Sequence, residues 1–264
     1  MKEKIAIILN SKIDKTDKVI NDLTNTFELS ELNFDLLDID NLKQGYNFVC
    51  AIGGDGTILK TSRYYAKTST PVMGVNLGRL GFLSLVTPEE IPLLGEIIKN
   101  KSYIVKDRLM LKSKEFHALN DIVIKGHSHV RTSKFDLYIN DILVSDYIAD
   151  GIIISTPTGS TAYGLSAGGP ILHPSLNSMV IVPICAHTMT ARPLVVPSYE
   201  KITVKTVDEL LDVSCDGQEN ISELKEVTIT KSEYTAKLAF PKDDNFYSVL
   251  KNKLYWGISP VSEI

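Results

Sequence analysis

Residues 46–66 read YNFVCAIGGDGTILKTSRYYA and indicate a strand, a glycine-rich loop and a helix in direct succession. Tyr46 to Ile52 form an apolar run of strand length, and the stretch from Ile58 to about Ala66 fits a helix. The glycines between them allow a tight turn and a close approach of the backbone to phosphate groups. Thr57 is a suitable N-cap for the helix, whose first N–H groups would be available to an anion. The stretch therefore predicts a phosphate-binding loop at the end of a buried strand.

Two charged residues in this stretch, Asp55 and Lys60, require an explanation. A carboxylate in a phosphate loop repels its ligand unless it binds a metal or takes a proton from the attacking group. The alternative is that Asp55 only stabilises the turn. A cation in the first turn of a helix opposes the helix dipole, so a bound anion would explain Lys60. A solvated surface lysine is the alternative for that residue.

A second informative stretch, residues 150–170, reads DGIIISTPTGSTAYGLSAGGP. Its apolar start, Ile152 to Ile154, indicates a buried strand. Small and hydroxyl residues follow, and buried hydroxyls need hydrogen-bond partners. Small residues also let a flat ligand reach the backbone. The stretch predicts a ligand site, and a Gly- and Ser-rich surface turn is the alternative.

The remaining periodicity predicts two domains. Up to residue 99, strand and helix signals alternate, which favours a parallel sheet with helices around it. The strands are expected at 5–10, 34–38, 46–52 and 71–76, and the helices at 15–27, 58–66 and 89–99. From residue 100 to 243, short strand-like runs and turns predict a mostly antiparallel, sandwich-like domain. These runs are 102–111, 118–124, 135–139, 142–147, 151–155, 180–184, 194–196, 201–207, 226–230 and 235–240, and a helix is expected at 246–254.

Composition narrows the possible function classes. The 264 residues are 44% hydrophobic and carry a net charge of −4, which gives no basic footprint for nucleic acid or an anionic membrane. The three scattered cysteines suggest reduced thiols and a cytoplasmic location. The N-terminal apolar run is too short for a signal peptide, and no run approaches the length of a membrane span.

Five segments in one order resemble the NAD kinase family over residues 5–260. They are GGDGT at 53–57, NLGRLGFL at 76–83, LND at 119–121, the 150–170 stretch, and ARPLVVP at 191–197. Diacylglycerol-type lipid kinases and phosphofructokinases carry similar GGDGT loops, whereas the TPTGSTAY…SAGGP pattern is much more specific. The resemblance implies a Rossmann-like α/β domain at 1–99, a β-rich NAD-binding domain at 100–243, and a segment 244–264 that returns to the first domain.

The resemblance also implies a reaction, in which ATP phosphorylates the 2′-hydroxyl of the adenosine ribose of NAD to give NADP. It assigns Asp55 as the proton acceptor and implies Mg²⁺ or another divalent cation with ATP, whose protein ligands are unknown. The loop for the ATP phosphates is expected to consist of Gly53, Gly54, Gly56, Thr57, Asn76 and Gly78. In the family, sites are completed across subunits, so a homodimer or homotetramer is implied.

We expect NAD to contact residues from all of these segments. They are Asp55, Gly56, Lys60, Asn120, Asp121, Arg131, Asp150, Thr158, Thr161, Ala162, Tyr163, Gly164, Leu165, Ser166 and Gln218. Asp121 is one methylene shorter than the Glu of many family members. Tyr163 could stack on the ligand or donate its hydroxyl, and a half-buried core tyrosine is the alternative. Asp216-Gly217 looks like a hairpin turn, and Arg192 could satisfy backbone carbonyls.

Two other functions compete with this one. A lipid kinase would need an apolar cleft, against which the small and polar 150–170 stretch argues. An NADP-binding sensor without catalysis would have no need for Asp55. A dehydrogenase is less favoured because no G-x-G-x-x-G motif follows the first strand.

Overall fold

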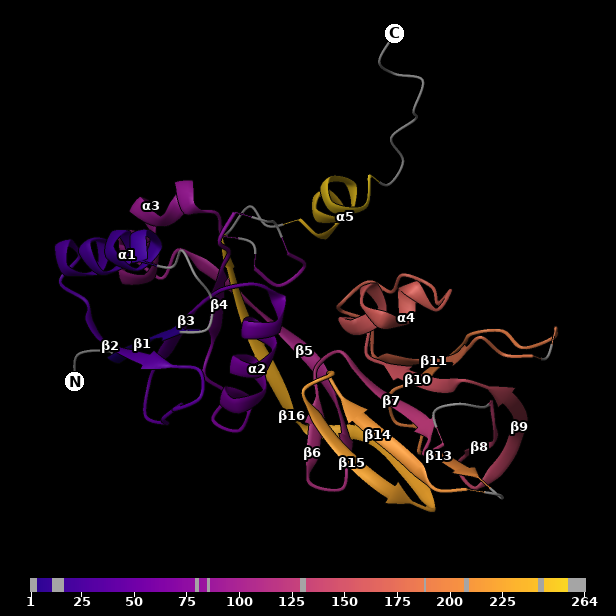
Figure 1. The fold of residues 1–264 in the computed structure, drawn as a ribbon. Coiled ribbons are helices and arrows are strands. Elements are labelled where there is room, and N and C mark those ends of the chain that lie inside the picture. Colours follow the sequence, from indigo (N-terminus) through magenta and orange to yellow (C-terminus); the bar gives the residue numbers. More distant parts are fainter. Residues whose placement is uncertain are drawn as a thin grey trace, which may run out of the picture. The chain divides into compact units, whose positions relative to one another are not determined.

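The computed structural model describes residues 4–10, 17–78, 81–84, 86–128, 132–187, 189–206, 209–241 and 245–255. The chain forms two compact units, one of residues 1–107 with 237–264 and one of residues 108–236 (Figure 1). Each unit has its own hydrophobic core. No helix within the described ranges combines the length and hydrophobicity that spanning a bilayer requires.

The first unit is built on a parallel sheet. Its strand order is β2 (Asn33–Asp38), β1 (Lys4–Leu9), β3 (Phe48–Ile52), β4 (Val72–Val75) and the end of β16 (Glu226–Pro241). All four pairings are parallel, and at the last one Leu238 and Ala239 lie opposite Val72 and Met73. Strands β3 and β4 are fully buried, as expected for a sheet that is covered on both faces.

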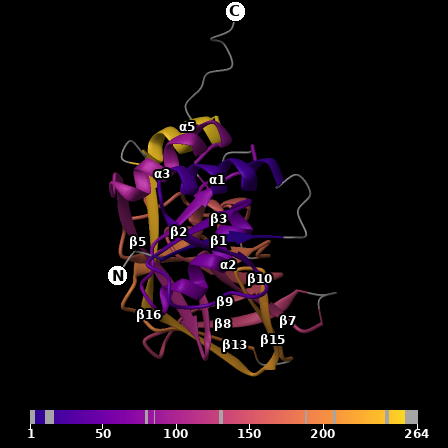
Figure 2. The same cartoon turned by 90° about the vertical axis from the view of Figure 1, so that its left-hand side faces the viewer.

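Helices cover both faces of this sheet. Helices α1 (Asp17–Leu29) and α3 (Ile91–Lys99) pack against each other and share one core with β1 and β3, while α2 (Asp55–Ala66) covers the opposite face (Figures 1 and 2). A short 3₁₀ helix, η1 (Pro88–Glu90), precedes α3. Helix α5 (Phe246–Leu254) also belongs to this unit.

The second unit consists of two sheets. The six-stranded antiparallel sheet has the order β12 (Leu194–Pro197), β11 (Ser178–Ile184), β10 (Gly151–Ser155), β7 (Asp121–Gly126), β14 (Leu211–Cys215) and β15 (Glu219–Leu224). The other sheet contains β9 (Ile142–Ala149), β8 (Ser133–Ile139), β13 (Ile202–Thr206) and the first part of β16. Strand β5 (Tyr103–Ser113) pairs with β16 and with β6 (Phe116–Ala118).

The core of the second unit explains the apolar run in β10. Ile152 and Ile154 point into the core between the two sheets, because alternate residues of a strand face the same side. Ile153 points to the opposite face, where it packs with Val180, Val182 and Leu172. Three consecutive isoleucines are therefore buried in a sheet that is covered on both sides at this strand.

The expected fold class, an α/β domain with a β-sandwich-like domain, is confirmed. Several boundaries differ from the expectation. The predicted strand at 118–124 is split into β6 and β7 by Leu119 and Asn120, and the two predicted strands at 226–230 and 235–240 form the single strand β16. Strands β14 and β15, and the short helices η2 (Gly159–Thr161) and α4 (Tyr163–Ser166), were not expected.

The start of α2 corrects two predictions about the glycine loop. The helix begins at Asp55 and its N-cap is Gly54, so Thr57 lies inside the first turn and is not the cap. The reason is that extended backbone at Gly54 starts the helix earlier, and an acid in the first turn suits the positive end of the helix dipole. Lys60 consequently lies in the second turn, where the dipole argument for a bound anion is weak.

Candidate functional site

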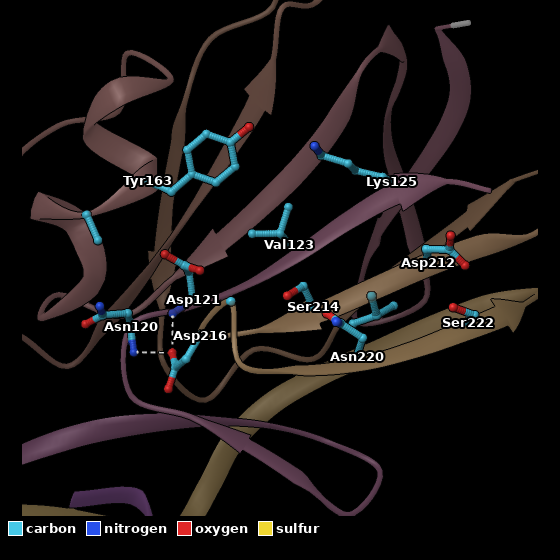
Figure 3. A pocket seen from close by; sticks show the side chains of 13 residues that line it. Asn120, Asp121, Val123, Lys125, Tyr163, Asp212, Ser214, Asp216, Asn220 and Ser222 are labelled. Atoms are coloured by element: carbon cyan, nitrogen blue, oxygen red, sulfur yellow. Dashed lines mark hydrogen bonds between the residues drawn. The ribbon is translucent and has the colours of Figure 1, made fainter. Parts of the chain in front are cut away.

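A cavity of about 600 Å³ opens on the second unit, on the side of the six-stranded sheet that faces away from the core between the sheets (Figure 3). Strands β7, β14 and β15 form its floor, and the segment of η2 and α4 forms one wall. The lining residues are Asn120, Asp121, Val123, Lys125, Ala162, Tyr163, Asp212, Val213, Ser214, Asp216, Gly217, Asn220 and Ser222. Four of the residues expected to bind NAD, Asn120, Asp121, Ala162 and Tyr163, therefore line one cavity.

Asp216 organises the backbone of the Asn120–Asp121 motif. Its carboxylate accepts three backbone N–H bonds, from Leu119 (2.9 Å), Asn120 (2.7 Å) and Asp121 (3.1 Å), and Figure 3 shows the two from Asn120 and Asp121. The Asp216 N–H donates in return to the Asp121 carbonyl at 2.9 Å. Asp216 and Gly217 both have positive φ in the turn between β14 and β15, which confirms the predicted hairpin turn. Its role as a support for Asn120 and Asp121 was not predicted.

Asp121 is a buried carboxyl group in this cavity, with an exposed fraction of 5%. Burial, together with the nearby charge of Asp216, raises the pKa of Asp121 to about 7. Near neutral pH the group therefore passes between a protonated form that can donate a hydrogen bond and an ionised form that only accepts.

Two hydroxyls of the 155–161 segment shape its backbone. Thr156 Oγ1 donates to the Leu119 carbonyl (2.6 Å) and accepts from the Gly159 N–H (2.9 Å). Ser160 Oγ donates to the Pro157 carbonyl (2.7 Å) and accepts from the Leu172 N–H (2.9 Å). A Cβ at Gly159 would lie only 2.0 Å from the Asn120 carbonyl oxygen. These residues thus build a tight turn against Asn120, and their hydroxyls are engaged within the protein.

Two other hydroxyls of the segment, those of Ser155 and Thr158, are buried and lack a hydrogen-bond partner within the described residues. A buried polar group without a partner is destabilising, and such groups often mark places that a ligand or water completes. Thr158 was expected at the NAD site, but it is buried and is not among the residues that line the cavity. The Thr161 hydroxyl donates to the Thr158 carbonyl at 3.3 Å.

Tyr163 begins α4 and points its ring into the cavity (Figure 3). Its side chain lines the cavity with an exposed fraction of 39%. Gly164 is buried behind it, where an added Cβ would lie 3.0 Å from the Ser155 hydroxyl. Leu165 and Ser166 follow in the same helix but do not line the cavity.

Of the other residues expected at the NAD site, Asp150 and Gln218 belong to the second unit but are not among the residues that line this cavity. Asp150 is exposed and immediately precedes β10, whose first residue, Gly151, lies beside the cavity residue Lys125: a Cβ at Gly151 would come within 3.1 Å of the Lys125 side chain. Gln218 is exposed in the β14–β15 turn. Arg131 lies outside the described residues.

The glycine loop of the first unit has the strand–loop–helix form that the sequence predicts. Gly53 has φ +152°, and a Cβ there would come within 2.6 Å of the Thr57 hydroxyl, so only glycine fits. Gly54 and Gly56 are exposed at the N-terminus of α2. The helix N-terminus thus presents its first N–H groups at an accessible glycine backbone, which is suited to a phosphate.

The Asp55 carboxylate is held by residues 82–84, a contact that the sequence did not predict. Its Oδ2 accepts the Phe82 N–H at 2.9 Å. Its Oδ1 accepts the Leu83 N–H (3.1 Å) and both the N–H (3.3 Å) and the hydroxyl (3.2 Å) of Ser84. A Cβ at Gly81 would lie 1.9 Å from Oδ1, so the absence of a side chain at that position permits the approach. Asp55 is thereby fixed in orientation.

Other residues expected at the loop are engaged locally. The Asn76 side chain accepts the Gly78 N–H at 2.8 Å and donates to the Ser84 carbonyl at 3.3 Å, and Gly78 has φ +111°. Both residues therefore shape the turn after β4. Lys60 forms an ion pair with Asp40 at 2.7 Å, which accounts for its position without a bound anion. Arg192 donates to the carbonyls of Met189 and Ala191, which confirms its predicted structural use.

Comparison with known families gives matches over most of the chain. The sequence pattern of the ATP-NAD kinase N-terminal domain matches residues 1–103, and that of the ATP-NAD kinase C-terminal domain matches residues 119–240. The NAD kinase of Legionella pneumophila (strain Corby) is 40% identical over 241 residues, which are 86% of this chain and 81% of the relative. The NAD kinase of Carboxydothermus hydrogenoformans is 39% identical over 233 residues, 83% of each chain.

Two solved structures share the fold. A crystal structure of an NAD kinase from Archaeoglobus fulgidus in complex with ATP matches with a TM-score of 0.79 at 28% identity, over 96% of this chain and 98% of that chain. The structure of yeast NADH kinase complexed with NADH matches with a TM-score of 0.82 at 23% identity, over 98% of this chain and 89% of that chain. The second similarity, at this identity, bears on the fold alone.

Proposed function

The chain belongs to the ATP-NAD kinase family and is an ATP-dependent NAD kinase, and from this premise we propose how its residues carry out the reaction. The γ-phosphate of ATP is transferred to the 2′-hydroxyl of the adenosine ribose of NAD, giving NADP. The observation that carries the proposal is the family match over both domains, at 1–103 and 119–240. The first domain, residues 1–99 with 244–264, serves the phosphates, and the second, residues 100–243, binds NAD.

Asp55 is the proposed proton acceptor. As the ribose oxygen bonds to the γ-phosphorus, the bond from that phosphorus to the β-phosphate oxygen breaks, and the hydroxyl proton passes to the Asp55 carboxylate. The four hydrogen bonds from residues 82–84 support this role because they fix the carboxylate in one orientation. The proposed phosphate loop comprises Gly53, Gly54, Gly56, Thr57, Asn76 and Gly78.

The cavity of the second unit is the proposed site for the adenosine half of NAD. Asn120 and Asp121 bind ribose hydroxyls or the adenine edge, for which an amide and a carboxyl group side by side are suited. Tyr163 offers its ring for stacking. Thr158, whose buried hydroxyl lacks a hydrogen-bond partner within the described residues, is a further proposed contact. The further proposed contacts are Asp55, Gly56, Lys60, Arg131, Asp150, Thr161, Ala162, Gly164, Leu165, Ser166 and Gln218.

A divalent cation, Mg²⁺ by preference, is proposed to enter with ATP. The described residues contain no group of three or more His, Cys, Asp or Glu side chains that could hold a metal by themselves. A single carboxylate at the glycine loop fits Mg²⁺, which is commonly held by phosphate oxygens, water and one or two carboxylates. Asp55 is the carboxylate at the loop that could join it. The bound cation would neutralise charge on the phosphates.

We propose that NAD sites are shared between subunits of a homodimer or homotetramer. Asp150 supports this because it is exposed and is not among the residues that line the cavity, so a second copy could bring its own Asp150 to the nicotinamide end. We also propose a cytoplasmic location. The free thiols Cys50, Cys185 and Cys215 support it, because reduced cysteines are typical of that compartment.

The direct test is an activity assay. Purified protein is incubated with NAD, ATP and Mg²⁺, and NADP is detected with a dehydrogenase specific for it. We expect NADP to accumulate. Measurable NAD binding without any turnover would contradict the proposal and favour the sensor function.

The role of Asp55 is tested by Asp55→Asn. We expect NAD binding to persist and turnover to fall by about 10² or more, because the amide cannot accept the proton. The Asn amide also places its own N–H groups against the N–H and hydroxyl donors of residues 82–84, which could disturb the loop. Ser84→Ala is therefore measured as a control for the loss of these hydrogen bonds. This variant removes one bond to Asp55 and keeps the carboxylate, and we expect it to lose less than about tenfold. Asp107→Asn, the same change at an exposed ion pair, controls for the loss of a negative charge. A near-normal rate for Asp55→Asn would rule out the proposed role.

A further inference from the structure

Helix α5 presents a cation whose position was not expected from the sequence. The Asn245 side chain caps the helix by accepting the Tyr247 N–H at 2.9 Å, and Val249 and Leu250 are buried. Lys251 and Lys253 lie in the last turn of α5, where a positive charge interacts favourably with the helix dipole.

Lys253 lies beside the proposed proton acceptor. Its Nζ is 3.8 Å from Asp55 Oδ2 and 5.2 Å from the centre of the Phe82 ring. The same Oδ2 accepts the backbone N–H of Phe82, so the residue whose ring contacts the ammonium also binds the carboxylate through its backbone. Both charged side chains are one-third exposed. A separation of 3.8 Å is too long for a hydrogen bond, so Lys253 is drawn to Asp55 electrostatically and is not bonded to it.

A cation at this place suits phosphoryl transfer. The transferring group carries negative charge on its oxygens, and enzymes of this kind offset it with lysine, arginine or metal ions placed in advance. Lys60, in the second turn of α2, is paired with Asp40 at 2.7 Å. Lys253 lies beside Asp55, the carboxylate that is proposed to accept the proton of the attacking hydroxyl. The phosphoryl group is transferred to the oxygen of that hydroxyl, so it must come close to Lys253 as well.

We propose that Lys253 is a further substrate-binding residue, whose ammonium binds a terminal phosphate of ATP during transfer. The inference rests on the proposed role of Asp55 and the glycine loop. Lys253 exchanges no proton in this step: the hydroxyl proton passes to Asp55, the phosphoryl group passes from ADP to the ribose oxygen, and the lysine side chain only offsets charge. The Phe82 ring supports the ammonium by a cation–π contact.

The test is ATP affinity, measured by calorimetry with Mg²⁺ and without NAD. Lys253→Met is compared with Lys253→Arg, which keeps the charge, and with Lys251→Met, which removes an exposed lysine from the same helix turn. We expect the Kd for ATP to rise about tenfold in Lys253→Met, because a charge-assisted phosphate contact is lost. We expect a rise of less than about threefold in Lys253→Arg and no more than about twofold in Lys251→Met. The Kd for NAD should be the same in all of them.

The outcomes separate binding from a structural role. If Lys253 only anchored α5, Lys253→Met would lower the melting temperature and Lys253→Arg would share the defect. An ATP affinity within about twofold of Lys251→Met would overturn the proposal. Turnover of the unmodified protein is measured separately: its absence would contradict the proposed function, while the ATP affinities would still decide the role of Lys253. Lys253→Gln replaces Lys253→Met if the latter fails to fold.

Discussion

Asp121 combines a position in the cavity with an unusual protonation equilibrium. Burial and the charge of Asp216 raise its pKa to about 7, so the carboxylate that would accept ribose hydroxyl bonds is formed only as the pH rises through neutrality. We expect NAD affinity to increase about tenfold between pH 6 and pH 8, since affinity follows the fraction of the competent form. Calorimetry at the two pH values measures this.

The control for this pH dependence is Asp121→Asn, which should flatten it. His127 requires a second control, His127→Gln, because its hydrogen bond to Asp212 raises the pKa of His127 and Asp212 also lines the cavity.

The pH dependence of the unfolding free energy gives an independent check, and its sign can be predicted. A carboxyl group with a raised pKa stabilises the fold at low pH and loses that contribution as the pH rises through about 7. The wild-type protein should therefore lose unfolding free energy relative to Asp121→Asn from pH 5 to pH 8. A pH-dependent affinity that persists in Asp121→Asn would assign the effect elsewhere.

Tyr163 tests whether the cavity binds a flat ring. A stacked aromatic contact contributes about 1–3 kcal/mol, so Tyr163→Ala should weaken NAD binding by about 5- to 150-fold. Tyr163→Phe keeps the ring and should retain most of the affinity. Tyr199→Ala removes another exposed tyrosine of the same unit and serves as the control. Unchanged affinity in Tyr163→Ala, measured by calorimetry, would remove Tyr163 from the site.

Among the elements, the β14–β15 hairpin supports the NAD motif from another part of the chain. Asp216→Asn replaces a carboxylate that accepts three N–H bonds with an amide that cannot match all of them. We expect a loss of about 2 kcal/mol in unfolding free energy and weaker NAD binding, because the donors around Asn120 lose an acceptor. Urea denaturation and calorimetry measure the two effects.

The matched control is Asp141→Asn. Asp141 also has positive φ in a hairpin turn, between β8 and β9, but its carboxylate is exposed and paired with Lys201. This change should cost less than about 1 kcal/mol. If both variants lost the same unfolding free energy, the effect of Asp216→Asn would come from the turn itself and not from the hydrogen bonds that Asp216 accepts from Asn120 and Asp121.

Local sequence patterns predicted the elements that have a clear period. The β3–loop–α2 unit, β10 and α5 follow from apolar spacing and glycine placement. The strands β14 and β15 were missed because polar residues alternate with the buried ones and their outer face lines a cavity. The hydrogen bond from Phe82 to Asp55 joins residues 27 positions apart, and the one from Asn120 to Asp216 joins residues 96 positions apart. Local sequence patterns cannot predict contacts over such separations. The hydroxyl-rich segment shows the same limit. Its sequence does not tell that Thr156 and Ser160 bond to the backbone, whereas the Thr158 hydroxyl has no hydrogen-bond partner among the described residues.

For the whole molecule, the position of Asp150 makes the subunit arrangement testable. If Asp55 of one subunit and Asp150 of another serve the same site, a chain with Asp55→Asn and a chain with Asp150→Ala can complement each other. In a mixed dimer, one site carries both changes and the other carries neither. Equal mixing gives about half mixed dimers with one intact site each, so about a quarter of wild-type turnover should return from two nearly inactive variants. The measurement is NADP formation after the two proteins are unfolded and refolded together, with each variant refolded alone as the control. Light scattering at assay concentrations gives the mass of the active species. No recovery on mixing, or a monomer that retains full activity, would show that each chain carries a complete site and that Asp150 does not act across an interface.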